Sequence, residues 1–326
     1  MLNSGGPFMK SPEIIPAALT APEWVGADPA SVRLRSAAAR LAQTHSTLLV
    51  RGESGTGKNL FAEIVHYVGP NRDQPLLKID CATLPEGLIE SELFGHEKGA
   101  FTGAAAAKVG RMEMAGKGTL VLDEVAALNP AMQAKLLRVV DQRTFERLGG
   151  STLRRLEARI IALTAVDLER AVRDGSFRED LYFRLAVVPI VLPPLHERPL
   201  DIRPLAEHFL AQLARLHAIS NPGISASALE ALEAHNFPGN ARELRNILER
   251  ALIEAAGAEI RRAHLPGPLA AGFLNEENRT MTLEEIEKAH IVTVLEATHH
   301  SLSRAASILG ITRKTLFLKR KRYHLD

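Results

Sequence analysis

The chain has 326 residues, 46% of them hydrophobic and 5% aromatic, which is enough for two or three helix-rich domains. Its single cysteine excludes an intrachain disulfide, and no apolar run approaches the ~18 residues of a membrane span, so we expect a cytoplasmic protein without membrane segments. The net charge of +2 is uneven, because residues 301–326 carry seven Lys or Arg and one acidic residue, which leaves −4 elsewhere. A basic tail on a mildly acidic body predicts nucleic-acid binding at one end.

Residues 1–22 are Gly- and Pro-containing and are predicted to be disordered or left over from cloning. Short apolar runs then alternate with helical patterns such as 31–43 and 59–68. The predicted strands are 47–50, 76–81, 119–122, 159–163 and 187–192. This alternation predicts an α/β fold, a parallel sheet with helices on both faces.

A phosphate-binding pattern follows the first predicted strand. Gly52-Glu-Ser-Gly-Thr-Gly-Lys58 has the form Gly-x4-Gly-Lys, in which backbone amides turn toward phosphate oxygens. Lys58, at the positive end of the next helix, is expected to reach the β- and γ-phosphates of ATP. The predicted nucleotide-binding residues are Gly52, Glu53, Ser54, Gly55, Thr56, Gly57, Lys58 and Asn59. The alternative is an ordinary glycine-rich turn before a helix.

Two carboxylates end the third predicted strand. In Gly118-Thr-Leu-Val-Leu-Asp-Glu124, Asp123 is expected to hold Mg2+, directly or through water, and Glu124 to act as general base toward the attacking water. The alternative is an acidic pair that only caps the strand. His299-His300 has no nearby partners, so magnesium is the only metal predicted.

Between these motifs lies Gly99-Ala-Phe-Thr-Gly-Ala104, preceded by Glu90-Ser-Glu-Leu-Phe-Gly-His-Glu-Lys98. Its glycines permit sharp turns, and Phe101 is an apolar group that an exposed tip does not usually carry without a partner. The hexapeptide, with its lead-in, resembles the sigma-54 contact loop of bacterial enhancer-binding proteins, AAA+ ATPases that remodel sigma-54 RNA polymerase. The resemblance implies a sigma-54 contact by Gly99, Ala100, Phe101, Thr102, Gly103 and Ala104. The alternative is a plain Gly/Ala surface hairpin.

The resemblance runs from about residue 23 to 326, with six motifs in family order. It implies a P-loop AAA+ α/β subdomain at 23–195 and a small helical lid subdomain at 196–263, where helices are predicted at 201–217, 225–235 and 240–255. A linker at 264–280, which contains Pro and Gly, and a C-terminal all-α helix-turn-helix domain at 281–326 follow.

Two further segments match family motifs. Phe177–Leu185 matches the segment that supplies arginines, here Arg178 and Arg184, to the neighbouring subunit's nucleotide, which implies a ring, expected to be a hexamer. Phe237–Leu244 matches the lid motif, in which Asn240 is expected to cap a helix and Arg242 to face the nucleotide. The alternatives are a surface helix and an ordinary helix start with a solvated arginine.

Three positions depart from the family pattern. Asn59 stands where a general P-loop has Ser or Thr for magnesium, so Thr56 or water would serve the metal. Asp80 and Ala165 stand where the family commonly has Asn, and Asp80 beside Glu124 would bring two carboxylates together. One hypothesis is slower or differently coupled ATP hydrolysis, and the other is drift with local compensation.

Residues 301–316 follow a helix, Gly turn, helix pattern, with Thr312 as N-cap of a basic second helix. The pattern closely resembles the Fis-type DNA-binding domain, in which 282–297 is expected to form the dimer helix. The predicted DNA-binding residues are Thr312, Arg313, Lys314, Thr315, Lys319, Arg320, Lys321 and Arg322, with the first basic pair at base edges and Lys319–Arg322 at phosphates. The alternative is a basic solvated tail helix.

Together these features predict an ATP-dependent activator that binds upstream double-stranded DNA and opens sigma-54 promoters. The short N-terminal segment implies either a removed regulatory domain or control by a partner protein in trans. The rival hypotheses are a DNA-binding, nucleotide-sensing scaffold with a weakened ATPase and a AAA+ remodelling factor of another class.

Overall fold

The computed structural model describes residues 22–220, 222–267, 269, 283–298 and 301–323. The predicted disordered N-terminus, most of the predicted linker and His299-His300 lie outside this part of the chain. The chain divides into two compact units, residues 1–265 and 266–326.

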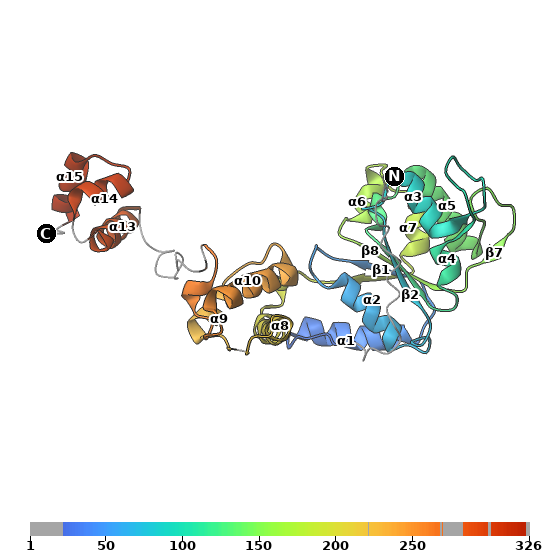
Figure 1. Cartoon of the computed structure of the whole chain (residues 1–326), viewed down its shortest axis with the longest axis horizontal. Helices are drawn as coiled ribbons and strands as arrows, with labels where there is room; N and C mark the ends of the chain where they lie inside the picture. Colours follow the sequence, from blue (N-terminus) through green and yellow to red (C-terminus); the bar gives the residue numbers. More distant parts are fainter. Residues whose placement is uncertain (1–21, 221, 268, 270–282, 299–300, 324–326) are drawn as a thin grey trace, which may run out of the picture. The chain divides into compact units, whose positions relative to one another are not determined.

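Five parallel strands form the central sheet of the first unit, in the order β2, β5, β8, β1, β9. Figure 1 labels β1, β2 and β8 of this sheet. Their bounds are β1 Leu48–Arg51, β2 Leu76–Asp80, β5 Thr119–Asp123, β8 Arg159–Thr164 and β9 Val188–Val191. Each lies at a predicted strand, so the predicted parallel α/β sheet is confirmed. Because all strands run in the same direction, their carboxyl ends share one edge, where ligands bind in folds of this kind.

Helices cover both faces of the sheet, as its apolar strands require. The first core joins one sheet face to the helices α3 Glu86–Phe94, α4 Arg111–Met114, α5 Pro130–Gln142, α6 Leu168–Arg173 and α7 Glu179–Leu185. The second core joins the other face to α1 Pro29–Ala42 and α2 Lys58–Tyr67. Strand β5 shows the alternation, with Leu120 and Leu122 in the first core and Val121 in the second.

Two small antiparallel pairs that the sequence did not predict extend from this unit. Strands β3 Gly95–His96 and β4 Lys108–Val109 form one pair, and β6 Thr144–Phe145 and β7 Arg154–Arg155 form the other. The pairs touch, because the Glu97 amide donates to the Leu148 carbonyl at 2.9 Å. Two-residue strands have no periodicity that a sequence could reveal.

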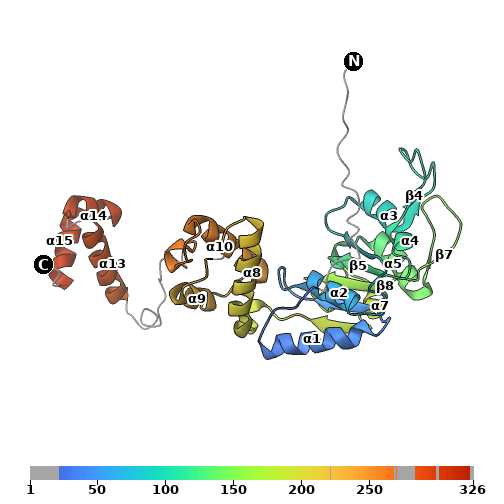
Figure 2. The ribbon, with the colours of Figure 1, turned by 60° about the horizontal axis from the view of Figure 1, so that its bottom comes forward.

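The helical part of the first unit contains α8 Ile202–Leu216, α9 Ala226–Glu233 and α10 Asn240–Ala255 (Figure 2). These helices pack together through buried leucines. The second unit contains α13 Leu283–Ala297, α14 Leu302–Ile308 and α15 Arg313–Tyr323 around a small core of its own. The hydroxyl of Thr312 accepts from the Thr315 amide at 3.1 Å, which is the predicted N-cap of the last helix. No helix in the described residues is long and apolar enough to cross a bilayer.

Candidate nucleotide site and contact surfaces

Two glycines of the loop from Gly52 to Lys58 are packed against other segments of the unit. Gly55 and Gly57 have left-handed backbones, with φ of 82° and 105°. A Cβ on Gly55 would lie 2.3 Å from the carbonyl oxygen of Gly239, and one on Gly57 would lie 3.2 Å from the ring of Trp24. The loop is therefore packed between the segment before α1 and the start of α10, and only glycine fits at position 55.

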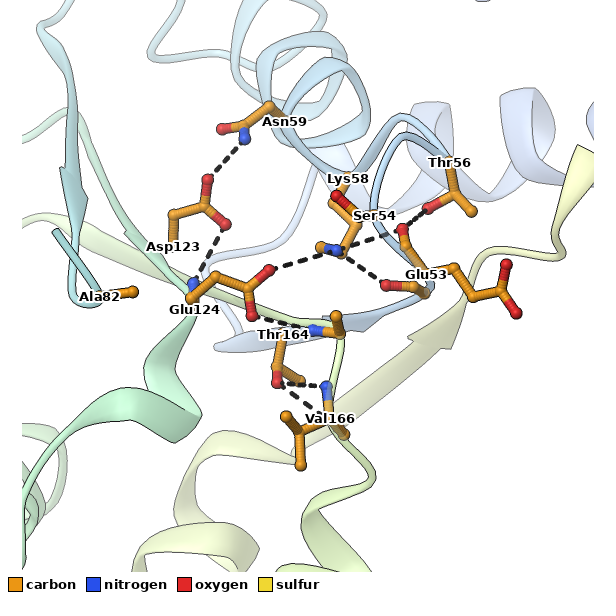
Figure 3. Close-up of polar contacts among 12 residues, drawn as sticks. Glu53, Ser54, Thr56, Lys58, Asn59, Ala82, Asp123, Glu124, Thr164 and Val166 are labelled. Atoms are coloured by element: carbon orange, nitrogen blue, oxygen red, sulfur yellow. Dashed lines mark hydrogen bonds and ion pairs between the residues drawn. The ribbon is translucent and has the colours of Figure 1, made fainter. Parts of the chain in front are cut away.

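The ammonium group of Lys58 lies at the centre of this loop (Figure 3). Its Nζ donates to the carbonyl oxygens of Gly52 at 2.7 Å and Glu53 at 3.3 Å, and lies 3.5 Å from Oε1 of Glu124. The residue is only 7% exposed, so its charge acts in a partly dry site where electrostatic interactions are strong. This is the place where the loop would hold phosphate oxygens.

Asp123 and Glu124 lie beside Lys58 at the end of β5. The Asp123 carboxylate accepts from Nδ2 of Asn59 at 2.6 Å and from the Glu124 amide at 3.1 Å. Glu124 has a left-handed backbone, with φ of 49° and ψ of 51°, and its Oε2 accepts from the Ala165 amide at 3.1 Å. A strained non-glycine residue held on both sides is typical of a functional site.

Asp80, for which the sequence predicts a carboxylate beside Glu124, is the last residue of β2. Sheet register places it opposite Asp123, and its Oδ1 accepts from the Ala82 amide at 2.8 Å. Burial, followed by the charges of Asp80, Asp123 and Glu124, raises the pKa of the nearby Cys81 thiol to about 12. Asp80, Asp123 and Glu124 thus act on the same thiol, which puts the three carboxylates in one electrostatic environment.

The residues present fit a magnesium ion that is shared with phosphates. Oδ1 of Asn59 is buried without a hydrogen-bond partner, next to the Asp123 carboxylate that its own Nδ2 contacts. Within the described residues, no group of three or more His, Cys, Asp or Glu side chains could hold a metal by itself. Mg2+ commonly takes one or two carboxylates and completes its shell with water and phosphate oxygens, which this donor set allows.

A cavity of about 360 Å³ opens over the loop. Its lining combines the phosphate loop and the two carboxylates with Trp24, Arg198, His208, Phe209, Arg242 and Arg245. Arg242 donates to the Ser54 hydroxyl at 2.6 Å, so the predicted lid arginine does reach the loop. Arg198, which the sequence analysis missed, is buried, donates to the Thr56 carbonyl at 2.8 Å and lies 5.4 Å from the centre of the Trp24 ring.

The predicted role of Asn240 as a helix cap is wrong. Gly239 is the N-cap of α10, and Asn240 is fully buried with a φ of 53°. Its side chain accepts from the Leu195 amide at 2.6 Å and donates to Oε2 of Glu53 at 3.0 Å and to the Ser54 carbonyl at 3.1 Å. The amide thus ties the phosphate loop to the helical part of the unit.

The two predicted arginines lie outside this cavity, at the two ends of α7. Arg178 is exposed and forms a two-point contact with Asp180, with distances of 3.0 and 2.7 Å. Arg184, also exposed, pairs with Asp141 at 2.7 Å. Exposed pairs of this kind are weak and can be exchanged for another partner.

The hexapeptide forms a projecting loop between β3 and β4 (Figure 2). The Gly99 amide donates to the Ala104 carbonyl at 2.9 Å and closes the loop, whose tip includes the exposed Thr102. Phe101 is 44% exposed, and its ring packs on the His96 ring in an edge-to-face arrangement with ring centres 5.0 Å apart. Ala100 lies against Gly149, so the second hairpin supports the base of the loop.

In the second unit, Arg313 and Lys314 are exposed in the first turn of α15, and Lys321 and Arg322 are exposed in its last turn. Lys319 is turned away from this surface, because its Nζ pairs with Oε1 of Glu287 in α13. Arg320 is half-buried. The structure therefore separates the predicted basic group into an exposed set and a lysine that joins two helices.

Three family models together match nearly all of the chain. Residues 24–191 match the model of the Sigma-54 interaction domain, and residues 196–282 match that of the AAA+ ATPase lid domain. Residues 282–323 match the model described as bacterial regulatory protein, Fis family. The nitrogen fixation protein VnfA of Azotobacter vinelandii is 44% identical over 88% of this chain and 56% of its own length. The regulatory protein AtoC of Escherichia coli is 41% identical over 91% of this chain and 67% of its own length.

Among solved structures, NtrX from Brucella abortus in complex with ATP superposes with a TM-score of 0.70 and 36% identity. The match covers 92% of this chain and 69% of the NtrX chain. The chain thus spans between about half and two thirds of the length of these relatives.

Proposed function

This chain belongs to the sigma-54-interacting family of AAA+ transcriptional regulators, and on that premise we propose that it is an ATP-driven activator of sigma-54 promoters. It would bind upstream DNA through the second unit and drive RNA polymerase from the closed to the open promoter complex. The observation that carries the proposal is the convergence of Lys58, Asp123 and Glu124 on one cavity at the carboxyl edge of the sheet.

The chemistry assigned to this cavity is ATP hydrolysis. Lys58 is released from the loop carbonyls when phosphate oxygens replace them, and it then balances their charge. Glu124 accepts a proton from the attacking water, with the Ala165 amide holding its other oxygen in place. A magnesium ion, when bound, would neutralise phosphate charge, and we infer that Asp123 and Asn59 would hold it.

Completion of the site requires a second copy of the chain. Arg178 and Arg184 lie outside their own cavity and are engaged only by exposed acidic partners, which suits arginines that serve a neighbouring subunit. An arginine supplied in this way is worth roughly 10³–10⁵ in rate. Activity would therefore depend on assembly into a ring, which we take to be a hexamer.

The projecting loop would transmit the effect of ATP hydrolysis to sigma-54. Its backbone is closed on itself, and Phe101 and Thr102 are presented to solvent at its tip. We assign the sigma-54 contact to these two side chains. The exposed basic residues of α15 would bind the DNA and so keep the protein near the promoter.

Steady-state ATP turnover measured against protein concentration, with Glu124→Ala as the blank, tests the proposal. Turnover that rises steeply with concentration is expected, because neighbours complete each site. Turnover at the level of the blank, with nucleotide still bound, would instead favour a DNA-binding nucleotide sensor whose hydrolysis is weakened at Asp80 and Ala165.

A further inference from the structure

Two large apolar side chains stand on the surface of the basic helix. Phe317 is 59% exposed and Leu318 is 57% exposed, both in the middle of α15. Exposed apolar groups that lie next to each other mark contact surfaces when a suitable partner can be named. Neither residue belongs to the basic set that the sequence analysis assigned to DNA.

These residues share one face of the helix with the basic side chains. Exposure in α15 falls on three pairs, Arg313-Lys314, Phe317-Leu318 and Lys321-Arg322, which are spaced by four residues. Residues four apart lie above one another on a helix, so the apolar pair is bracketed by a basic pair on each side. At 1.5 Å per residue the two basic pairs are about 12 Å apart, close to the width of the major groove.

The opposite face of α15 is fixed to its own unit. Leu316 and Tyr323 are buried in the small core, and Lys319 and the Tyr323 hydroxyl both contact the carboxylate of Glu287 in α13. The helix therefore cannot rotate to bury Phe317 and Leu318 without losing these contacts. The apolar pair must face whatever the flanking cations bind.

Thymine is the chemical partner that fits this arrangement. The edges of the base pairs in the major groove are polar except for the C5-methyl group of thymine, which proteins read by apolar contact. A second copy of this chain fits poorly, because a contact between two such faces would oppose like charges on both sides of the apolar pair.

Resting on the proposed DNA-binding function, we propose that Leu318 and Phe317 read thymine methyl groups in the major groove while the basic pairs hold the phosphates and neighbouring bases. The two apolar side chains thereby set part of the sequence specificity. Removal of one thymine methyl should weaken binding about fourfold, the equivalent of about 0.8 kcal/mol for one buried carbon.

The experiment starts with duplexes enriched from a random-sequence pool by the full chain. Each thymine of the best duplex is then replaced singly by deoxyuridine, which lacks only the methyl group, and Kd is measured by fluorescence anisotropy at one fixed salt concentration. We expect one or two positions in each half-site at which the unaltered protein loses about fourfold in affinity. Leu318→Ala or Phe317→Ala should remove this difference, whereas Leu318→Met should keep it.

Ile308→Ala is the matched control, since Ile308 is 64% exposed but lies on α14. It should retain the full difference between thymine and deoxyuridine. The proposal is overturned if no thymine matters to the unaltered protein, or if the difference survives in both alanine variants. It is also overturned if Leu318→Ala reduces self-association in sedimentation while discrimination persists. Failure to enrich any duplex would contradict the DNA-binding function itself, which separates the two outcomes.

Discussion

The phosphate loop, residues 52–58, and the projecting loop, residues 99–104, both depend on glycine, but their surroundings differ. Gly55 and Gly99 have nearly the same backbone, with φ of 82° and 84°. A Cβ on Gly55 would collide with the Gly239 carbonyl, whereas a Cβ on Gly99 would meet nothing within 4 Å. The first loop is shaped by close packing inside the unit, whereas the second is supported at its base by Gly149 and is otherwise shaped by its turns.

This difference indicates where each loop finds its partners. Lys58, Arg198 and Asn240 donate to carbonyl oxygens of the phosphate loop, and Arg242 donates to the Ser54 hydroxyl, so the loop is held in place before a nucleotide arrives. The projecting loop has one internal aromatic contact, between Phe101 and His96, and otherwise presents its tip to solvent. A preorganised loop suits binding and catalysis, and an exposed loop suits a transient contact with another protein.

The largest effect should come from Gly55→Ala. The left-handed backbone costs an alanine roughly 1–2 kcal/mol, and the clash with the Gly239 carbonyl displaces either the loop or α10, so nucleotide binding should fall at least about tenfold. Gly99→Ala is a matched control with the same backbone cost and no clash. A fluorescent ATP analogue measures both, and equal losses in the two variants would contradict the role of packing.

Phe101→Ala tests the other loop. We expect promoter opening by sigma-54 polymerase to be abolished while ATP turnover remains near that of the unaltered protein, since Phe101 contacts His96 but does not line the nucleotide cavity. Val32→Ala is a control with similar exposure, 46% against 44%, on α1. Retained promoter opening would refute the assignment of the loop.

Asn240→Asp should also weaken nucleotide binding, by about tenfold, because a carboxylate cannot donate to Glu53 or the Ser54 carbonyl and instead repels Glu53. Asn236→Asp adds the same charge at an exposed position nearby and should have little effect. Calorimetric titration with ADP distinguishes the two variants. Equal affinities would show that the buried amide does not hold the loop.

Local sequence patterns correctly predicted the strands of the sheet and the position of the phosphate loop beside it. All five strands lie at predicted positions, and the phosphate loop and the Asp123-Glu124 pair lie together because parallel strands end at one edge. The prediction of Asn240 as a cap failed because the amide binds residues 45 and 187 positions away, which no local rule describes. Arg198 was missed for the same reason, since its contact with Thr56 spans 142 positions.

Exposure was the other property that the sequence could not supply. Lys319 and Lys321 both belong to the basic run, yet the helix turns the first toward Glu287 and the second toward solvent. The helix-turn-helix pattern does predict that Leu316 packs into the core, and Leu316 is buried, but it does not predict that the adjacent Phe317 is exposed.

A more modest gain is expected from restoring asparagine at two positions. Asp80→Asn combined with Ala165→Asn should raise ATP turnover a few-fold, because one carboxylate leaves the neighbourhood of Glu124 and a polar side chain returns beside the γ-phosphate. Each single variant serves as control for the pair. Unchanged turnover in the double variant would show that the departures are compensated locally.

The smallest change is expected in the alkylation rate of Cys81, which depends on the charges near the phosphate loop and can be measured without nucleotide. With its pKa raised to about 12, mainly by burial and then by Asp80, Asp123 and Glu124, the thiol is almost wholly protonated at pH 8. Iodoacetamide should therefore modify native Cys81 far more slowly than the unfolded chain, and the rate should rise with pH up to about 12.

Asp80→Asn removes the first of the three charges, so it should lower the pKa of the thiol and speed alkylation a few-fold at pH 8. Burial, the main cause of the raised pKa, remains in this variant, and modification should still be slower than in urea. Asp73→Asn, at an exposed site before β2, is the charge-matched control and should leave the rate unchanged. If Asp80→Asn also leaves it unchanged, the Asp80 carboxylate does not raise the pKa of the Cys81 thiol.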